Sequence, residues 1–224
     1  MSAAFASRRA HREQCATVSA TSTPQQSIVT LDLEGVLVPE IWIAVAERTG
    51  IEALRRTTRD EPDYDVLMRG GLQLLSEHGL TMSTIADVIS TLSPLEGARE
   101  FLDTLRSMTQ VLLLSDTFEQ FGQPLMRQLG FPTLICHRLV VENDQIVDYT
   151  LRLPDQKREA VRALHGLNYR VIAAGDSFND TAMLAEADAG FLSHAPDSIK
   201  TMFPQFTAVD EYDELLALIV AQIT

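Results

Sequence analysis

This 224-residue sequence contains only two cysteines and no long hydrophobic run. Cys15 and Cys136 form neither a disulfide framework nor a metal-ligand pattern. This scarcity favours a reducing compartment, so we expect a cytoplasmic protein. No apolar run approaches the roughly 20 residues that a membrane-spanning helix needs, so we expect no membrane partner.

Positive charge is also scarce, because 18 Lys and Arg residues face 31 Asp and Glu residues, for a net charge of −13. Nucleic acids are bound by basic surfaces, so we expect no nucleic-acid partner. An acidic protein that acts on an anionic substrate needs a cation to offset the repulsion. The five histidines show no ligand spacing, and we expect them to be solvated or packed.

Residues 1–27 differ from the rest of the chain in composition. Ser, Thr, Ala and Gln dominate, and three arginines accompany a single acid. Such a segment buries too little apolar surface to fold alone, so we predict a disordered N-terminal extension. Its Arg-rich, acid-poor character is also typical of organelle transit peptides, whereas the long apolar core of a secretory signal is absent. An over-extended start is the plainer alternative, and these interpretations stay open.

The first clear element is the apolar, β-branched run that begins at Ile28. It leads into Asp32, skips one residue to Glu34 and breaks at Gly35. A short apolar run that ends at a glycine is typical of a strand buried on both faces of a parallel sheet. Ligands of such sheets bind beyond the carboxyl ends of the strands, where the two acids would lie. Two carboxylates at this spacing can divide the roles of nucleophile and acid/base.

Residues 39–93 carry helical signals and no strand signal. Apolar residues suggest four short helices, over 41–48, 51–57, 62–75 and 83–92. Gly70 and Gly71 interrupt the third of these. We therefore expect a small, all-helical cap inserted over 39–93 and closed by Ser93-Pro94.

Beyond this insertion, predicted strands alternate with predicted helices. The strands are expected at 111–114, 171–174 and 190–192, with an antiparallel hairpin over 137–141 and 145–151. The helices are expected at 98–107, 121–129, 155–164, 181–187 and 215–223. This alternation predicts an α/β fold with a doubly wound, mostly parallel Rossmann-like sheet, formed by residues 28–38 and 94–224.

Polar residues end three of the predicted buried strands, and these strand ends should meet at one edge of the sheet. They are Asp32, Glu34, Ser115, Asp176 and Asp180. Lys157 opens the helix before the third strand. Each residue alone has an ordinary explanation, such as a solvated lysine or a serine helix cap. Together, the acids suit Mg²⁺, and the hydroxyl and lysine suit the oxygens of a phosphoryl group.

The same residues carry a resemblance to a known family. Asp32-Leu-Glu-Gly, Ser115, Lys157 and the segment GDSFND at 175–180 match the four motifs of the haloacid dehalogenase superfamily of phosphohydrolases. A helical cap between the first two motifs resembles the phosphoserine phosphatase branch. The segments DLEGVLVPE, LSDTF and AAGDS most resemble bacterial members that also transfer phosphate from phosphoserine to homoserine. The likeness runs from about Ile28 to the C-terminus.

The resemblance implies a Mg²⁺-dependent phosphomonoesterase that acts through an aspartyl-phosphate. Asp32 would attack phosphorus, and Glu34 would protonate the leaving oxygen and then activate water. The metal would be held by Asp32, Asp176 and the backbone carbonyl of Glu34, with Asp180 in support. The residues expected to bind the substrate in the core are Ser115, Asp116, Lys157 and Asn179. Lys157 would also keep Asp32 ionised. The sequence leaves the oligomeric state open, with a homodimer among the alternatives.

The resemblance also assigns the substrate contacts of the cap. Glu40 matches a glutamate that binds the substrate ammonium, but Gly71 stands where an arginine should bind the substrate carboxylate. Arg69 is the nearest candidate for that contact, with Arg56 and Arg59 as others, provided that the helix breaks at Gly70-Gly71. Two positions along an unbroken helix differ by about 200°, so Arg69 could not otherwise replace residue 71.

Three other functions remain open from the sequence. One is a phosphatase of another small phosphorylated metabolite. A receiver-like phosphoacceptor domain also pairs acids with Ser/Thr and Lys, but it needs neither a leaving-group acid such as Glu34 nor a cap. A non-catalytic binding module would not be expected to keep the nucleophile, acid, lysine and metal acids together.

Overall fold

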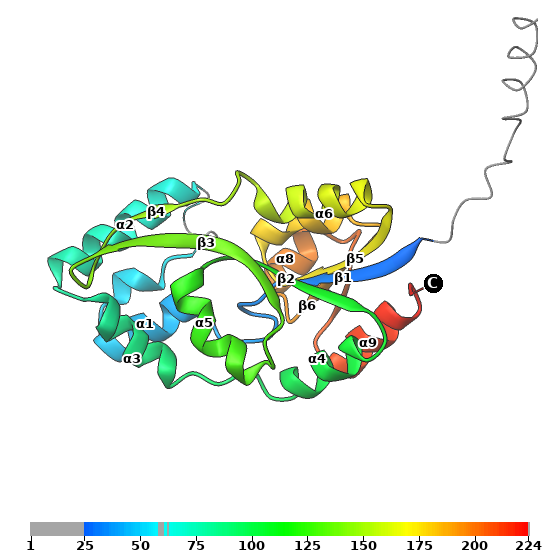
Figure 1. The fold of residues 1–224 in the computed structure, drawn as a ribbon, viewed down its shortest axis with the longest axis horizontal. Coiled ribbons are helices and arrows are strands. Elements are labelled where there is room, and N and C mark those ends of the chain that lie inside the picture. The colour runs from blue at the N-terminus through cyan, green and yellow to red at the C-terminus, as the bar shows by residue number, and fades with distance from the viewer. Residues whose placement is uncertain (1–24, 58–60, 62, 224) are drawn as a thin grey trace, which may run out of the picture.

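The computed structural model describes residues 25–57, 61 and 63–223, and its centre is a seven-stranded sheet in the order β4-β3-β2-β1-β5-β6-β7 (Figure 1). All neighbouring strands are parallel except the hairpin β3–β4. The strands are β1 (Gln26–Leu31), β2 (Gln110–Phe118), β3 (Thr133–Glu142), β4 (Gln145–Thr150), β5 (Tyr169–Gly175), β6 (Ala189–Ser193) and β7 (Thr207–Val209).

The helices cover both faces of this sheet, and a further group lies at one end of it (Figure 1). They are α1 (Ile41–Thr49), the 3-10 helix η1 (Glu52–Arg55), α2 (Tyr64–Glu77), α3 (Met82–Ser90), α4 (Ala98–Arg106), α5 (Glu119–Gln128), α6 (Gln156–Gly166), the 3-10 helix η2 (Phe178–Asp180), α7 (Thr181–Glu186), α8 (Asp197–Met202) and α9 (Tyr212–Val220). The doubly wound α/β prediction is therefore confirmed.

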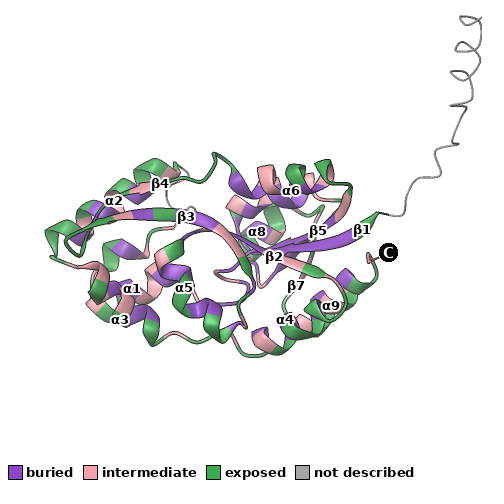
Figure 2. Ribbon diagram, viewed as in Figure 1, coloured by how far each residue is buried: buried purple, intermediate pink, exposed green. Residues whose placement is uncertain are grey.

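The core consists of two apolar layers, one on each face of the sheet. One contains side chains of α4, α5 and α9, and the other contains side chains of α6, α7 and α8. Strands β1 and β5 are buried along most of their length between these layers (Figure 2). This explains why their sequences are nearly continuous apolar runs rather than alternating ones.

Some elements differ from the sequence prediction in extent. Strand β1 begins at Gln26, two residues before the apolar run, and β2 continues through Ser115 to Phe118. Strand β7 and helix α8 were not predicted because each is too short for a periodic signal. The predictions for residues 1–27 fall outside the described residues up to position 24.

Helix α2 corrects one specific expectation, because it runs without a break from Tyr64 to Glu77. Gly70 and Gly71 lie inside it rather than interrupting it. Glycine lowers helix stability without preventing helix formation, and the buried apolar residues Met68, Leu72 and Leu75 hold this helix in place.

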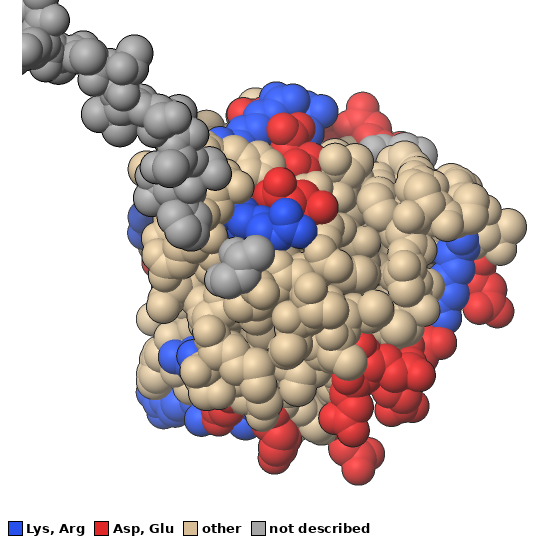
Figure 3. Space-filling model, turned by 90° about the vertical axis from the view of Figure 1, so that its right-hand side faces the viewer, with Lys and Arg blue, Asp and Glu red and all other residues tan. Residues whose placement is uncertain are grey.

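Charge on the surface is mixed, and no large basic area appears on the face drawn in Figure 3. There, Lys and Arg side chains form separate groups beside acidic ones (Figure 3). Every helix within the described parts of the chain is too short or too polar to cross a membrane.

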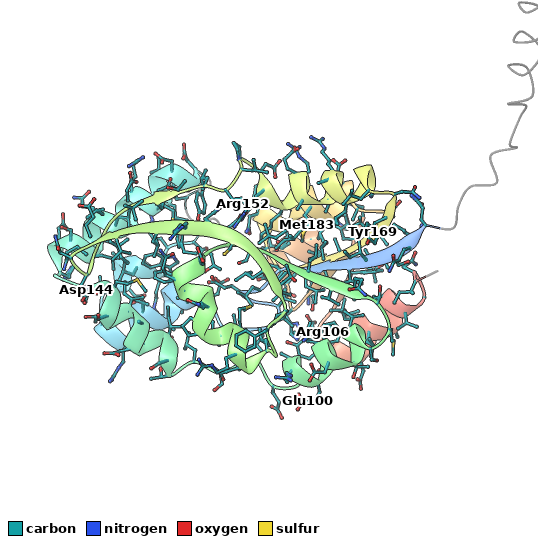
Figure 4. The ribbon with its side chains drawn as sticks, viewed as in Figure 1. Glu100, Arg106, Asp144, Arg152, Tyr169 and Met183 are labelled. Atoms are coloured by element: carbon teal, nitrogen blue, oxygen red, sulfur yellow. The ribbon has the colours of Figure 1, made fainter. Side chains whose placement is uncertain are left out.

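The hairpin β3–β4 reaches the helices of residues 41–90. Asp144 lies at its tip (Figure 4) and its side chain accepts hydrogen bonds from the N–H and hydroxyl of Ser83, at 3.0 and 2.9 Å. Tyr149 of β4 donates to Asp65 of α2 at 2.5 Å. The expected all-helical cap is therefore joined by a hairpin that the sequence placed with the core, and the cap boundary of 39–93 stays a prediction.

Candidate active site

Three adjacent parallel strands bring the predicted polar residues to one edge of the sheet. Asp32 directly follows β1, Ser115 lies in β2, and Asp176 directly follows β5. Strand β1 is paired with both of the others, and the N–H of Asp32 continues the ladder by donating to Ala174 at 2.9 Å. The sheet register thus determines which side chains meet, as the sequence predicted.

Lys157, in the first turn of α6, is the cation at the centre of this group. Its side chain is 2% exposed, and its Nζ lies 2.9 Å from Asp32 Oδ1 and 2.7 Å from Asp180 Oδ1. Asp116 Oδ2 lies further away, at 3.9 Å. Burial alone would lower the pKa of Lys157, but the carboxylates of Asp180, Asp32 and Asp116 outweigh it and hold the pKa well above its usual value.

The negative charge of these carboxylates together exceeds the positive charge of Lys157. Burial, then repulsion from Asp180, raise the pKa of Asp32 well above its usual value, and Lys157 offsets this only in part. The attraction to Lys157 lowers the pKa of Asp32, and the role of keeping Asp32 ionised stays a prediction. The lysine is nevertheless insufficient by itself, and further positive charge would lower the pKa of Asp32.

Asp32, Asp176 and Asp180 can each place one oxygen within 4.8 Å of the other two, and all three are buried. Such a set of hard oxygen donors with surplus negative charge fits Mg²⁺. Asp180 is already engaged, because its Oδ1 accepts from Lys157 and its Oδ2 accepts from the N–H groups of Asp176 and Ser177. Both oxygens of Asp180 are thus engaged, whereas the contacts of Asp32 with Lys157 and with the N–H of Leu33 both use its Oδ1. A supporting role for Asp180 beside Asp32 and Asp176 stays a prediction.

Two glycines make this close approach possible. A Cβ on Gly175 would overlap the side chain of Asp180, and a Cβ on Gly35 would overlap that of Asp176. Gly35 also has a φ of 76°, which non-glycine residues rarely adopt. The glycines of the first and third strand ends therefore serve the packing of the carboxylates.

Glu34 does not join this cluster but is directed toward the helices of residues 41–90. Its Oε2 accepts a hydrogen bond from the N–H of Ile41 at 3.0 Å. Burial, then repulsion from Glu40, raise the pKa of Glu34 to about 7, against hydrogen bonds from Thr117 and Ile41 that lower it. A carboxyl group with a pKa near neutrality can both donate and accept a proton, as general acid–base catalysis needs.

Asp116 and Asn179 form a second polar group beside Lys157. Asn179 Nδ2 donates to Asp116 Oδ2 at 2.8 Å, and Tyr64 of α2 donates its hydroxyl to the backbone carbonyl of Asp116 at 2.8 Å. Buried His137 has its Nε2 3.5 Å from Asp116 Oδ1. Tyr64 and His137 were not predicted as site residues, because nothing in the sequence shows that α2 and β3 approach β2.

A cavity of about 400 Å³ lies between these residues and the segment that contains α1, η1 and α2. From the strand ends it is lined by Asp32, Glu34, Ser115, Asp116, Thr117, Lys157, Ser177 and Asn179. From the opposite side it is lined by Glu40, Trp42, Ala53, Leu54, Arg56, Thr57, Tyr64, Leu67, Met68, Gly70, Gly71, Gln73, Leu74 and Glu77. Most of the predicted site residues, including Glu40, therefore share one cavity.

Arg69 is the predicted substrate contact that the structure does not bring to the cavity. It forms an ion pair with Asp65 at 2.8 Å and lies 3.8 Å from Asp148, and its side chain is 62% exposed. The reason is the unbroken helix, which places positions 69 and 71 on different faces. Arg56 does line the cavity, although it also lies 3.6 Å from Glu61. Arg59 falls outside the described residues.

Comparison with known proteins gives two curated relatives that align over 189 residues. "Phosphoserine phosphatase" of Pseudomonas syringae pv. tomato is 66% identical, covering 84% of this chain and 80% of the relative. "Phosphoserine phosphatase ThrH" of Pseudomonas aeruginosa is 62% identical, covering 84% and 92%. Residues 26–188 also match the family model of haloacid dehalogenase-like hydrolases.

The fold is similar to solved structures over nearly its whole length. A "Phospho-Aspartyl Intermediate Analogue of Phosphoserine phosphatase" superposes with a TM-score of 0.73 and 19% sequence identity, covering 89% of this chain and 100% of that one. At this identity the likeness concerns the fold alone, and it agrees with the doubly wound architecture described above.

Proposed function

We propose that the substrate of this chain is phosphoserine. The chain belongs to the haloacid dehalogenase-like hydrolase family and is a phosphoric monoester hydrolase. The name "Phosphoserine phosphatase", which both of the relatives described above carry, supports this substrate. The observation that carries the proposal is the buried pair of Asp32 and Lys157, 2.9 Å apart, in a cavity that also contains Glu34 and Glu40.

In the proposed reaction, a carboxylate oxygen of Asp32 attacks phosphorus while the bond from phosphorus to the serine oxygen breaks. Glu34 gives its proton to that leaving oxygen, so free serine and an aspartyl-phosphate result. Glu34, now ionised, takes a proton from water, whose oxygen attacks phosphorus and releases phosphate and Asp32. Ser115 and Lys157 hold the phosphoryl oxygens, with Asp116 and Asn179 beside them.

Mg²⁺ is the proposed metal, held by Asp32, Asp176 and the backbone carbonyl of Glu34, with Asp180 in support. When bound, the ion supplies positive charge beside the phosphoryl oxygens. The surplus of buried carboxylates over Lys157 supports this assignment. The chain's own part is to orient these carboxylates, which the glycines at 35 and 175 and the backbone donors to Asp180 achieve.

For the amino acid part of the substrate, we propose that Glu40 pairs with the ammonium and Arg56 with the carboxylate. Both line the cavity, on the side opposite the strand ends. Arg56 thus takes the role that the sequence suggested for Arg69, whose guanidinium is directed to Asp65 and Asp148 outside the cavity. Arg56 is the arginine that the cavity contains among the described residues.

The test compares phosphoserine with ethanolamine phosphate, which has an ammonium but no carboxylate. Glu40→Gln should raise KM for both esters, because losing a charge partner costs on the order of 2 kcal/mol or more. Arg56→Gln should raise KM for phosphoserine alone, by about tenfold or less because Arg56 is half exposed. Arg69→Gln is the matched control, and from its place outside the cavity we expect neither KM to change.

Phosphate release from wild type decides the substrate itself. If phosphoserine is not hydrolysed faster than ethanolamine phosphate, the chain is a phosphatase of another small metabolite. Equal effects of Arg56→Gln on the KM of both esters would show that Arg56 does not bind the substrate carboxylate.

We further propose that the aspartyl-phosphate can transfer its phosphoryl group to homoserine. Homoserine is serine lengthened by one methylene, so Glu40 and Arg56 can hold its ammonium and carboxylate, and Glu34 can remove its hydroxyl proton in place of water's. When the enzyme is incubated with phosphoserine and homoserine in the absence of ATP, mass spectrometry should detect phosphohomoserine.

A cytoplasmic location and a homodimer stay predictions. Light scattering of the purified protein would test the homodimer.

A further inference from the structure

The cavity extends beyond the reaction centre to the middle of α2, where Gly70 and Gly71 line it. Gly71 lies one turn after Leu67 and Met68 and one turn before Leu74, so it occupies the centre of the helix stripe that faces the cavity. At this point α2 presents bare backbone to the space in which the leaving group of a phosphomonoester would lie.

Neither glycine is needed for backbone conformation or for packing. Both lie inside an α-helix, and neither has the positive φ that favours glycine. A Cβ on Gly70 would meet no described atom within 4 Å, and one on Gly71 would meet only the Trp42 ring, at 3.7 Å, among the described residues. By contrast, a Cβ on Gly122 of α5 would come within 2.7 Å of Leu134, which is a packing reason for glycine.

Glycine is among the least favourable residues in a helix interior, so two in succession weaken α2. Since packing does not require them, the remaining consequence is the space that they leave in the cavity. The ring of Trp42 is the described group nearest to that space. On this side the cavity is lined by the apolar residues Trp42, Ala53, Leu54, Leu67, Met68 and Leu74 and by the polar residues Glu40, Arg56, Thr57, Tyr64, Gln73 and Glu77. The apolar part of this lining is suited to a hydrocarbon or aromatic substituent.

We propose that Gly70 and Gly71 form a subsite for an apolar substituent on the leaving group. The substrate class then includes phosphomonoesters of alcohols bulkier than serine, with a branched alkyl or aromatic group against Trp42 and Met68. This rests on the proposed phosphatase site, because the same cavity contains Asp32 and Lys157. Each methylene that the subsite buries should raise kcat/KM by about fourfold.

The test fills the subsite and compares substrates of different size. Gly71→Leu should lower kcat/KM for p-nitrophenyl phosphate at least about tenfold more than for phosphoserine or ethanolamine phosphate, since its four side-chain carbons displace about two or more carbons of the substituent. Gly71→Ala should lower kcat/KM for p-nitrophenyl phosphate about threefold more than for the other two esters. It should also raise the thermal midpoint, because alanine favours the helix. It therefore keeps the proposal testable if the leucine variant folds poorly.

Gly166→Ala is the matched control, because Gly166 is a helical glycine of α6 that does not line the cavity and whose Cβ would meet no described atom within 4 Å. It should raise the thermal midpoint without changing the preference among the three esters. Equal losses on all three esters in Gly71→Leu, or no loss on any, would overturn the subsite. A wild type that hydrolyses p-nitrophenyl phosphate and ethanolamine phosphate but not phosphoserine would instead refute the proposed substrate, and the subsite would still be judged on the other two.

Discussion

Glu34→Gln tests the proposed role of Glu34 in both halves of the reaction, which are the formation and the hydrolysis of the aspartyl-phosphate. It removes a carboxyl group that accepts a hydrogen bond from Ile41 and whose pKa is about 7, and leaves an amide of almost the same shape. Serine is a poor leaving group that needs a proton, whereas nitrophenolate leaves without one. The variant should therefore form the aspartyl-phosphate from p-nitrophenyl phosphate but not from phosphoserine, and should be slow to hydrolyse it.

The same pKa makes a prediction for stability. A carboxyl group whose pKa rises from 4.5 to about 7 on folding contributes a free energy that is fully present below pH 4.5 and is lost as the pH rises to about 7. This difference corresponds to about 3 kcal/mol. We reduce it to about 1.5 kcal/mol, because the side chain is only partly buried and solvent screens its charge. Glutamine has no such dependence, so the variant should gain stability relative to wild type as the pH rises.

Two assays check these expectations. In rapid-mixing experiments, Glu34→Gln should release about one equivalent of nitrophenolate in a burst and then stall, with phosphoserine turnover below roughly a hundredth of wild type. In chelator, its thermal midpoint relative to wild type should rise by roughly 3–6 °C between about pH 4 and about pH 8. Full phosphoserine turnover would refute the acid role, and a midpoint difference that does not change with pH would refute the raised pKa.

Three further substitutions and one treatment test the remaining roles. Asp32→Asn should lower turnover by at least about three orders of magnitude with the circular dichroism spectrum unchanged, and retention of a tenth of wild-type activity would exclude Asp32 as the nucleophile. A chelator should abolish phosphatase activity, and added Mg²⁺ should restore it. Asp176→Asn should raise the Mg²⁺ concentration that is needed for activity. Full activity in chelator would exclude a required metal. Lys157→Met should lower stability by about 3–5 kcal/mol, because it leaves the carboxylates of Asp32 and Asp180 buried without their cation, and calorimetry showing no loss would contradict that pairing.

The sequence predicted the ends of β1 and β5 well because the signal there is local, whereas β2 continues past Ser115 to Phe118. An apolar run followed by an acid marks both the strand and the place where it ends, and parallel strands order their ends along one edge. Asp32, Ser115 and Asp176 could thus be assigned to one site before any contact was known. Lys157, which alone would be explained as a solvated lysine, was grouped with these residues because it opens the helix before the third strand, and the resemblance to the family motifs supported that grouping.

The substrate side of the cavity could not be predicted in the same way, because it depends on which face a helix presents. The pair Gly70-Gly71 suggested a helix break that would free Arg69, but burial of Leu72 and Leu75 holds α2 together and keeps Arg69 outside. The approach of Tyr64 to Asp116 had no local signal either, since 52 positions separate them in the chain.

The sequence by itself therefore determined the fold class, the order along the chain of the strands and helices around the site, the acids that follow β1 and β5, and the lysine at the start of α6. These follow from short-range patterns of apolar and polar residues. Only the tertiary structure decided that Glu34 is directed toward the N-terminus of α1 while Asp32 pairs with Lys157. It also decided that Arg56 rather than Arg69 lines the cavity, and that the glycines of α2 line the cavity opposite the strand ends. Those features depend on the packing of α2 and the hairpin across the strand ends, which long-range burial determines and no local pattern encodes.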